Sequence, residues 1–465
     1  MRHVPVFVLV VLLLVPLFGC GGSQKEEEEA TAGQPNILLV LTDDQPAATV
    51  AEMPQVQAQL VDEGLSFTHA YVSHPRCCPS RATILTGRHP HNHGIISNSE
   101  PEGGAQGFAA KGLEEDTIAT RLKEAGYATG YFGKYFNGYD GGRVPPGWDE
   151  WVAVAGGLSG DTYRVDFGGE TEIIRREEWH PSDLFGGHAE AFVKTHAEKP
   201  WFAYVAPLDP HGPYYPAPRH AHDFDGVQLP DKPSFDRVDP SQPSFVRDLP
   251  PLSDAQKSEL RQIYEDKLEA LQTVDDLVAE MVEALDETGQ LNNTYIVFLT
   301  DNGVTMGEHR FFDKKKGVPY EEAVRTPLII RGPGVPAGES RTELASNVDL
   351  APTFAALADT EPPSKPDGRS LVPLLSRDPP ASWREAVLLK ARNKYPLSFS
   401  GVRTPRYAYF EYENGEEELY DMRSDPYQRK SIHESADPAL LEDLRGRLRA
   451  LEDCSGAGCR EAEGS

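Results

Sequence analysis

The stretch Asn36-Ile-Leu-Leu-Val-Leu-Thr42-Asp43-Asp44-Gln45 decides the fold class of this chain of 465 residues. Its uninterrupted apolar run is typical of a central strand that is covered on both faces. Two carboxylates, Asp43 and Asp44, follow directly after the run. Ligand sites of open α/β sheets form at this carboxyl edge, although such a pair also fits a helix cap beside a solvated acid. The stretch predicts an α/β fold with a ligand site at one edge of its sheet.

The same arrangement recurs at Asn293-Thr-Tyr-Ile-Val-Phe-Leu-Thr300-Asp301-Asn302-Gly303, where a second apolar run ends in polar side chains. Three carboxylates and an amide that gather at one sheet edge would repel one another without a cation. Oxygen ligands favour Ca²⁺ or Mg²⁺ over Zn²⁺. The residues therefore predict a site for one of these two ions, and they do not separate the two.

A third stretch, His74-Pro-Arg-Cys77-Cys78-Pro79-Ser80-Arg81-Ala-Thr-Ile-Leu85-Thr86-Gly87, predicts a loop that leads into a helix. Pro79 suits the first helical turn, and Gly87 suits the end of the helix. Cys77 then lies where free backbone N–H groups and the positive end of the helix dipole hold anions. Arg81 faces the same side and offers a planar fork of donors to a tetrahedral oxyanion. The alternative is a buried cysteine pair beside a capping loop.

This third stretch resembles the signature of the sulfatase family, Cys-x-Pro-Ser-Arg followed four residues later by Leu-Thr-Gly. The resemblance implies an α/β fold like that of alkaline phosphatase: a large mixed, mostly parallel sheet flanked by helices, with a smaller C-terminal antiparallel sheet plus helix. It implies that a formylglycine-generating enzyme oxidises Cys77 to formylglycine, whose hydrated aldehyde is the nucleophile. The implied metal is Ca²⁺, with Mg²⁺ as the alternative, and its implied ligands are Asp43, Asp44, Asp301 and Asn302 with the modified Cys77 beside the ion.

The same resemblance assigns further residues of the site. The second sulfate-contacting lysine of the family stands four residues before the aromatic of a Tyr-Glu pair, which is Lys316 when counted from Tyr320, with Lys314 and Lys315 beside it. His309 either lines the pocket or has a supporting role. The implied catalytic residues besides Cys77 are Arg81, Lys134 and Lys316, which contact the sulfate, and His211, which protonates the leaving alcohol.

One motif departs from the commonest sulfatase pattern, which has histidine two residues after the first lysine. This chain has Lys134-Tyr135-Phe136-Asn137, which is similar to the Gly-Lys-Tyr-x-Asn of N-acetylglucosamine-6-sulfatases and heparan endosulfatases. The resemblance makes Asn137 a candidate substrate contact and implies hydrolysis of O-sulfated sugars, such as 6-O-sulfated N-acetylglucosamine units of glycosaminoglycans. Two alternatives stay open: a phosphonate or phosphate ester hydrolase of the same superfamily, and a catalytically silent surface lipoprotein that binds glycans.

The N-terminus has the features of an export signal, because residues 4–18 form an apolar run behind Arg2. The run ends in Leu17-Phe18-Gly19-Cys20, which resembles a bacterial lipobox with Cys20 as the lipidated residue. We expect the protein at the bacterial cell surface, in contact with the membrane through its lipid only, or secreted if the lipobox is not used. The expected segments are a lipoprotein signal peptide (1–19), an acidic tether (20–34), a catalytic domain (35–379) and a small C-terminal subdomain with the terminal tail (380–465).

The composition restricts the partners, since 73 acidic against 45 basic residues give a formal charge of −28. A nucleic-acid-binding protein normally carries a basic stripe, so we expect no nucleic-acid partner. Besides the lipobox and signature cysteines, the chain has a C-terminal pair whose spacing permits a small disulfide loop, Cys454 and Cys459. An alternating histidine tract fits a transition-metal site, a polar loop or a substrate rim, and it comprises His89, His91 and His93.

Overall fold

The computed structural model describes residues 33–157, 160–312, 315–393 and 397–464. The predicted signal peptide, most of the acidic tether and the lipidation site Cys20 lie outside the described residues, as does Lys314. Within the described part of the chain, no helix combines the length and the apolar character needed to cross a membrane. Residues 34–465 group into one compact unit, and the proposed boundary at residue 380 falls inside it.

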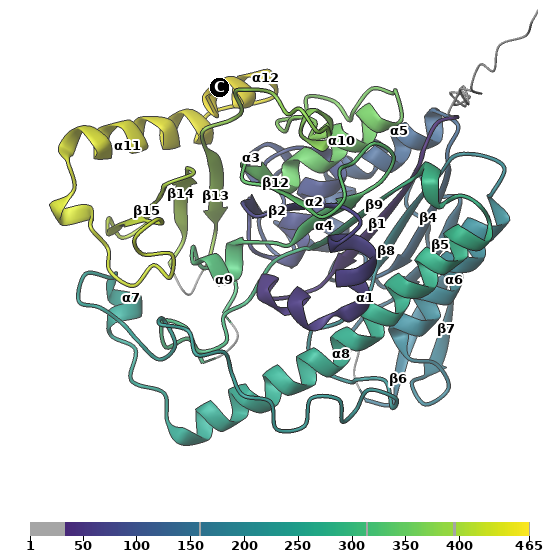
Figure 1. Cartoon of the computed structure of the whole chain (residues 1–465), viewed down its shortest axis with the longest axis horizontal. Coiled ribbons are helices and arrows are strands. Elements are labelled where there is room, and N and C mark those ends of the chain that lie inside the picture. Colours follow the sequence, from purple (N-terminus) through teal and green to yellow (C-terminus); the bar gives the residue numbers. More distant parts are fainter. Residues whose placement is uncertain (1–32, 158–159, 313–314, 394–396, 465) are drawn as a thin grey trace, which may run out of the picture. The chain divides into compact units, whose positions relative to one another are not determined.

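A large sheet carries the candidate site. Its strands are β1 (Asn36–Thr42), β2 (Leu65–Phe67), β4 (Ala128–Gly133), β5 (Glu150–Val154), β6 (Thr162–Phe167), β7 (Glu170–Arg175), β8 (Trp201–Ala206), β9 (Thr294–Thr300), β10 (Leu328–Arg331) and β11 (Glu339–Arg341). Their order is β11-β2-β10-β9-β1-β8-β4-β5-β6-β7 (Figure 1). The central strands from β9 to β5 run parallel, whereas β10, β6 and β7 run antiparallel to their inner neighbours. The predicted mixed, mostly parallel sheet is confirmed.

The two strands that precede the predicted metal ligands are direct neighbours in this sheet. β1 and β9 pair in parallel register, so that Thr42 lies opposite Thr300. The backbone N–H of Asp301 donates to the carbonyl oxygen of Thr42 at 3.0 Å. Parallel strands in register end at the same edge, and the carboxylates that follow them therefore leave the sheet side by side.

Helices cover both faces of the sheet. On one face, Leu38 and Val40 of β1 pack with α6 (Pro181–Thr195) and α8 (Asp254–Glu287), which crosses the sheet in Figure 1. On the other face, the alternate residues of β1 pack with α2 (Cys77–Thr86), α5 (Ile118–Glu124) and α10 (Leu350–Leu357). Successive side chains of a strand point to opposite faces, so β1 is apolar at every position from 37 to 41.

Shorter elements connect these layers. They are α1 (Pro54–Val56), α3 (Pro90–His93), α4 (Gly104–Ala110), α7 (Ser244–Arg247), α9 (Glu321–Val324) and the short strand pair β3 (Ala70–Tyr71) and β12 (Ala345–Ser346).

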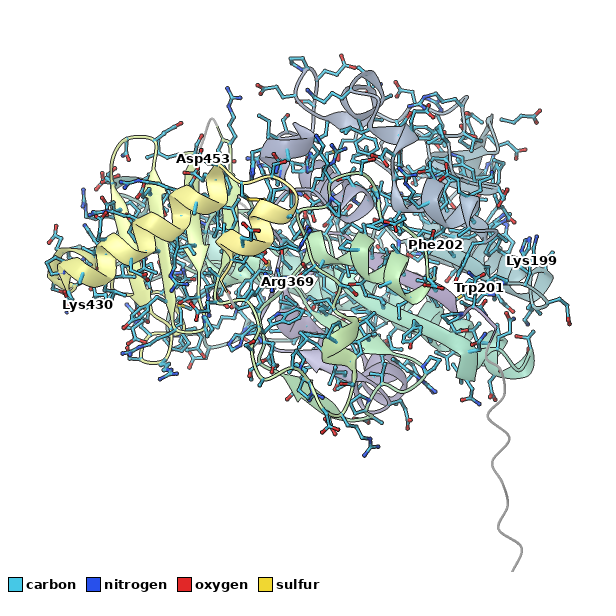
Figure 2. The ribbon with its side chains drawn as sticks, turned by 90° about the horizontal axis from the view of Figure 1, so that it is seen from above. Lys199, Trp201, Phe202, Arg369, Lys430 and Asp453 are labelled. Atoms are coloured by element: carbon cyan, nitrogen blue, oxygen red, sulfur yellow. A yellow bond between two sulfur atoms is a disulfide. The ribbon has the colours of Figure 1, made fainter. Side chains whose placement is uncertain are left out.

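A small antiparallel sheet follows near the C-terminus, as predicted. Its strands are β13 (Val387–Ala391), β14 (Phe399–Arg403), β15 (Tyr407–Tyr412) and β16 (Glu417–Asp421), paired in chain order. Helix α11 (Pro438–Glu452) lies along this sheet, as Figure 2 shows, and packs on it through Leu444, Leu448 and Leu451. The chain continues into α12 (Ala457–Ala462).

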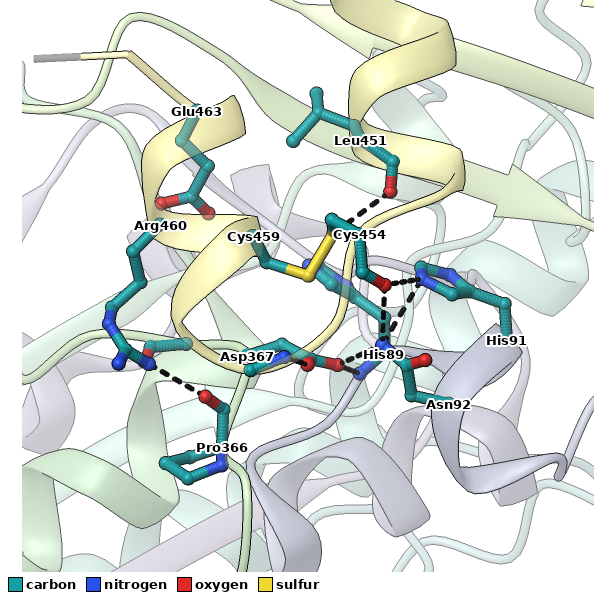
Figure 3. Close-up of a disulfide and its surroundings, with 12 residues drawn as sticks. His89, His91, Asn92, Pro366, Asp367, Leu451, Cys454, Cys459, Arg460 and Glu463 are labelled. Carbon is teal, nitrogen blue, oxygen red and sulfur yellow. Dashed lines mark hydrogen bonds between the residues drawn. A yellow bond between two sulfur atoms is a disulfide. The ribbon is translucent and has the colours of Figure 1, made fainter.

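Cys454 and Cys459 form the predicted disulfide (Figure 3). The carbonyl oxygen of Cys454 accepts a hydrogen bond from the amide of Asn92 at 3.0 Å and lies 3.1 Å from Nε2 of His91. The loop therefore holds α3, which follows the signature helix. His89 and His93 of the same tract are 1 % and 3 % exposed. His91 is partly exposed and contacts the disulfide loop.

Candidate active site

The polar ends of β1 and β9 meet at one edge of the large sheet. Asp43, Asp44, Asp301 and Asn302 are all buried there. The side-chain amide of Asn302 donates to Oδ1 of Asp44 at 2.7 Å, and the backbone N–H of Asp44 donates to Oδ1 of Asp301 at 3.3 Å. The structure thus brings together the four residues that the sequence assigned to a metal site.

Helix α2 directs its first turn at this cluster. Gly87 ends the helix with a φ of 65°, a left-handed conformation that glycine adopts without strain. Cys77 is the first helical residue and is fully buried, with its Sγ 3.5 Å from Oδ1 of Asp43. One turn on, Nε of Arg81 donates to Oδ2 of Asp301 at 2.9 Å, and its Nη2 lies 3.6 Å from Oδ2 of Asp43.

Two lysines from distant loops complete the cluster. Lys134 follows β4 directly and donates a hydrogen bond to the carboxylate of Asp43. Nζ of Lys316 lies 2.7 and 2.9 Å from the two carboxylate oxygens of Asp44, and 3.1 Å from Sγ of Cys77. Cys77 therefore lies among the three cationic side chains that the sequence predicted around it.

His211 lies on the loop after β8, beside the cluster. Its Nε2 is 3.5 Å from Oδ2 of Asp44, and its Nδ1 is 2.5 Å from the carbonyl oxygen of Gly212. Burial lowers the pKa of His211, although the Asp43 carboxylate opposes this shift. The contact at Nδ1 fits an N–H that donates to Gly212, which leaves Nε2 facing the cluster for proton exchange.

The charges of the cluster are strongly coupled. Burial alone would raise the pKa of Asp43, but Lys134, His211 and Arg81 hold it well below its usual range. Burial and repulsion from Asp43 raise the pKa of Asp301 to about 6. Burial, and then Asp43, raise the pKa of the Cys77 thiol to about 12, so an unmodified thiol at this position is protonated and poorly nucleophilic at neutral pH.

The donor set fits a hard divalent cation. Oδ1 of Asn302 is buried and has no hydrogen-bond partner within the described ranges. One donor atom from each of Asp43, Asp44, Cys77 and His211 lies within 4.8 Å of all the others. Carboxylate and amide oxygens are the ligands that Ca²⁺ and Mg²⁺ prefer, and a cation among them would relieve their mutual repulsion.

The two predicted substrate contacts occupy different positions. Asn137 is partly buried and touches the neighbour of the candidate nucleophile, since its backbone N–H and its Oδ1 each lie 3.3 Å from Sγ of Cys78. His309 is fully buried and stacks on Tyr320, with the ring centroids 3.9 Å apart. Of the two roles that the sequence left open for His309, the supporting one matches this position.

Sequence reasoning missed a residue from the small C-terminal sheet. Oδ1 of Asn393, two residues after the end of β13, accepts from Nε and Nη2 of Arg76 at 3.1 and 2.7 Å. The side-chain amide of Asn393 donates to the carbonyl oxygen of Gly317 at 2.7 Å. Asn393 thus joins the residue before Cys77 to the residue after Lys316. No sequence motif marks it, because the three segments meet only in the folded chain.

Comparison with known proteins decides the family. A family model described as Sulfatase matches residues 35–360. The chain belongs to the sulfatase family. A second model, N-sulphoglucosamine sulphohydrolase, C-terminal, matches residues 307–453 of this sulfatase. The family predicted from the signature is confirmed.

Individual relatives agree with this membership. Human N-acetylglucosamine-6-sulfatase is 30 % identical over 509 residues, which cover 99 % of this chain and 91 % of the human protein. The Drosophila melanogaster extracellular sulfatase SULF-1 homolog is 34 % identical over 383 residues, which cover 80 % of this chain and 34 % of the fly protein. The chain therefore spans about a third of the length of the fly relative, and about half that of a similar protein from Caenorhabditis elegans.

A solved structure is also similar to this chain. It contains a protein in complex with its substrate, D-glucosamine-2-N,6-O-disulfate. Its TM-score with this sulfatase is 0.77 at 25 % identity, and the match covers 93 % of this chain and 100 % of the other.

Proposed function

We propose that this sulfatase hydrolyses sulfate esters of sugars, with 6-O-sulfated N-acetylglucosamine units of glycosaminoglycans as the first candidate substrates. The observation that carries the proposal is the position of Cys77 in the first turn of α2, in contact with Lys316 and beside a donor set that fits a divalent cation. The name of the human relative and the substrate of the solved structure both support a sulfated glucosamine.

The side chains of the cluster have different roles in the reaction. Formylglycine made from Cys77 would supply a hydrated aldehyde as nucleophile. The cation, proposed as Ca²⁺ with Mg²⁺ as the alternative, would supply Lewis acidity beside it. Arg81, Lys134 and Lys316 bind the sulfate oxygens and stabilise the charge that develops on them. His211 gives a proton to the leaving sugar oxygen from its Nε2, where the negative charge of the bound sulfate favours protonation.

Four further assignments complete the proposal. Asn137 contacts the sugar, since it lies beside Cys78 at the start of α2, and His309 supports the Lys316 loop through Tyr320. A formylglycine-generating enzyme matures the protein. The protein is exported and anchored through Cys20, and the extracellular fly relative supports export.

Mass spectrometry of the tryptic peptide that contains residue 77 tests the nucleophile, and the expected result is formylglycine. Turnover of aryl sulfate is then compared with turnover of aryl phosphate and phosphonate esters, and sulfate is expected to be preferred. A mature protein with a thiol at residue 77 and no turnover would instead favour the silent glycan-binding lipoprotein. Inactivity toward 6-sulfated N-acetylglucosamine alone would remove only the substrate assignment.

The cation is tested by thermal melting of the protein before and after chelation. We expect chelation to lower the melting temperature and added Ca²⁺ to restore it better than Mg²⁺, because bound ligand stabilises the folded state. Asn302→Ala should reduce this Ca²⁺ response, whereas Asn414→Ala, an exposed control in the turn between β15 and β16, should not. An unchanged Ca²⁺ response in Asn302→Ala would remove Asn302 from the ligand set.

A further inference from the structure

A cavity of about 690 Å³ lies between the end of β7 and the loop that follows His211. Arg175 and Arg176 form one wall, and Tyr214 and Tyr215 form another. The arrangement is fixed at its base, since Nε2 of His180 lies 2.7 Å from the carbonyl oxygen of Tyr215. None of the roles assigned above uses this cavity.

Tyr214 connects the cavity wall to the active site. Its ring lies 5.2 Å from Nζ of Lys267, measured to the ring centroid. The same Nζ donates to the carbonyl oxygens of Asp44 and Pro210 at 3.0 and 2.8 Å. Tyr214 also follows His211 by three residues, so a sugar chain bound at His211 needs little length to reach the cavity.

The chemistry of the wall favours an anion. The guanidinium of Arg176 lies 3.9 Å from the centroid of the Tyr215 ring. Its Nε and Nη2 are shielded from solvent and have no hydrogen-bond partner in the part of the chain that the structure describes. These two donors form one edge of the guanidinium, which matches a carboxylate or sulfate group, and leaving buried donors unpaired is unfavourable.

The cavity lining also carries two acidic side chains, Asp161 and Glu177. Arg175 lies 3.4 Å from Glu177, and both side chains are mostly exposed. The backbone N–H of Arg176 donates to the carbonyl oxygen of Asp161, which holds the backbone but leaves the guanidinium for a ligand. The guanidinium of Arg176 also lies 5.9 Å from the centroid of the Tyr163 ring.

We propose that this cavity is a subsite for the neighbouring residue of an anionic glycan chain, with Arg176 binding a carboxylate or sulfate on that residue. The proposal rests on the proposed function and deepens it: the substrate is an acidic oligosaccharide, and its second anionic sugar contributes to binding. Tyr214 and Tyr215 present aromatic surfaces in the cavity lining.

Two substrates separate this subsite from the catalytic cluster: 6-sulfated N-acetylglucosamine, and a glycosaminoglycan tetrasaccharide in which a hexuronate adjoins the 6-sulfated residue. In Arg176→Gln, kcat/KM for the tetrasaccharide should fall at least about tenfold, mainly through KM, while the value for the monosaccharide stays within about twofold. Arg176→Lys keeps the charge but loses the paired donors of the guanidinium, so its kcat/KM for the tetrasaccharide should lie between those of wild type and Arg176→Gln. Arg164→Gln, an exposed arginine of β6 that does not line the cavity, is the matched control.

If Arg176→Gln lost kcat/KM equally on both substrates, or on neither, the proposed subsite would be refuted. Arg175→Gln changes an exposed side chain of the cavity lining, so it gives a second test if Arg176→Gln fails to fold, with the same selective loss expected. If the wild type hydrolyses no sulfate ester, the proposed function fails, and titration of the tetrasaccharide into Cys77→Ala protein then tests the subsite alone. Tetrasaccharide binding that is undetectable, or that Arg176→Gln leaves unchanged, would refute it.

Discussion

Replacement of Asn393 tests whether the small C-terminal sheet positions the catalytic loops. Asn393→Ala removes the acceptor for both Nε and Nη2 of Arg76 and the donor to the carbonyl oxygen of Gly317. The interaction with the charged guanidinium of Arg76 is worth about 1.5–3 kcal/mol and the neutral hydrogen bond about 0.5–1.5 kcal/mol, or together about 2–4.5 kcal/mol.

The loss should act on kcat more than on KM. Arg76 precedes Cys77 and Gly317 follows Lys316, so relaxation of either segment changes the distance of 3.1 Å between Sγ and Nζ. A misplacement of about 1 Å reduces turnover about a hundredfold, so we expect kcat of Asn393→Ala to fall about 10- to 100-fold. Steady-state kinetics on an aryl sulfate would measure this, with thermal melting to confirm that the variant is folded at the assay temperature.

Two variants serve as controls. Asn393→Asp keeps the acceptor for Arg76 but loses the donor to Gly317, so its kcat should lie between those of wild type and Asn393→Ala. Asn414→Ala removes an exposed asparagine from the turn between β15 and β16, where its side chain is hydrogen-bonded to Glu416, and should leave kcat unchanged. Folded Asn393→Ala protein with wild-type kcat and KM would refute the positioning role.

Three further predictions concern stability. Burial raises the pKa of Glu418 from 4.5 to about 7 despite hydrogen bonds from Tyr412, Tyr420 and Tyr320, a change that corresponds to about 3 kcal/mol. The folded state then binds the extra proton, so the free energy of unfolding should decline as the pH rises from about 4.5 to 7. Glu418→Gln should flatten this decline in thermal melts recorded across that range, whereas identical pH profiles of variant and wild type would contradict the assignment. Arg384 bridges Asp349 and Glu463 with all three side chains buried, and Glu463 also pairs with Arg369. Arg384→Met should destabilise the fold by about 3–5 kcal/mol, because it leaves the buried carboxylate of Asp349 without its ion-pair partner. Lys194→Ala, which removes a lysine beside the exposed Glu190 and Glu287, should leave the melting temperature unchanged, and equal effects of the two replacements would contradict this prediction. The double replacement of Cys454 and Cys459 by serine should cost about 2 kcal/mol of stability, as the closed loop is short, with turnover preserved; a loss of turnover in the folded variant would show that the loop reaches the active site.

The sequence by itself determined the framework of the large sheet, the signature helix and the family. β1 and β9 are apolar between their polar end residues because helices cover both faces, and this pattern is visible without coordinates. The helical spacing of apolar residues in α8 is likewise visible without coordinates. By contrast, β7 reads Glu-Thr-Glu-Ile-Ile-Arg and is largely exposed at the edge of the sheet, so its pattern carried no strand signal.

Only the tertiary structure decided which residues meet. The pairing of β1 with β9 sets Asp43 beside Asp301, and the sequence could supply the residues but not their register. Asn393, Arg176 and the buried position of His309 had no local signal, because their contacts join segments that are far apart in the chain. Hydrophobic periodicity reports which face of an element is buried, whereas a hydrogen bond between two distant loops depends on how the whole core packs.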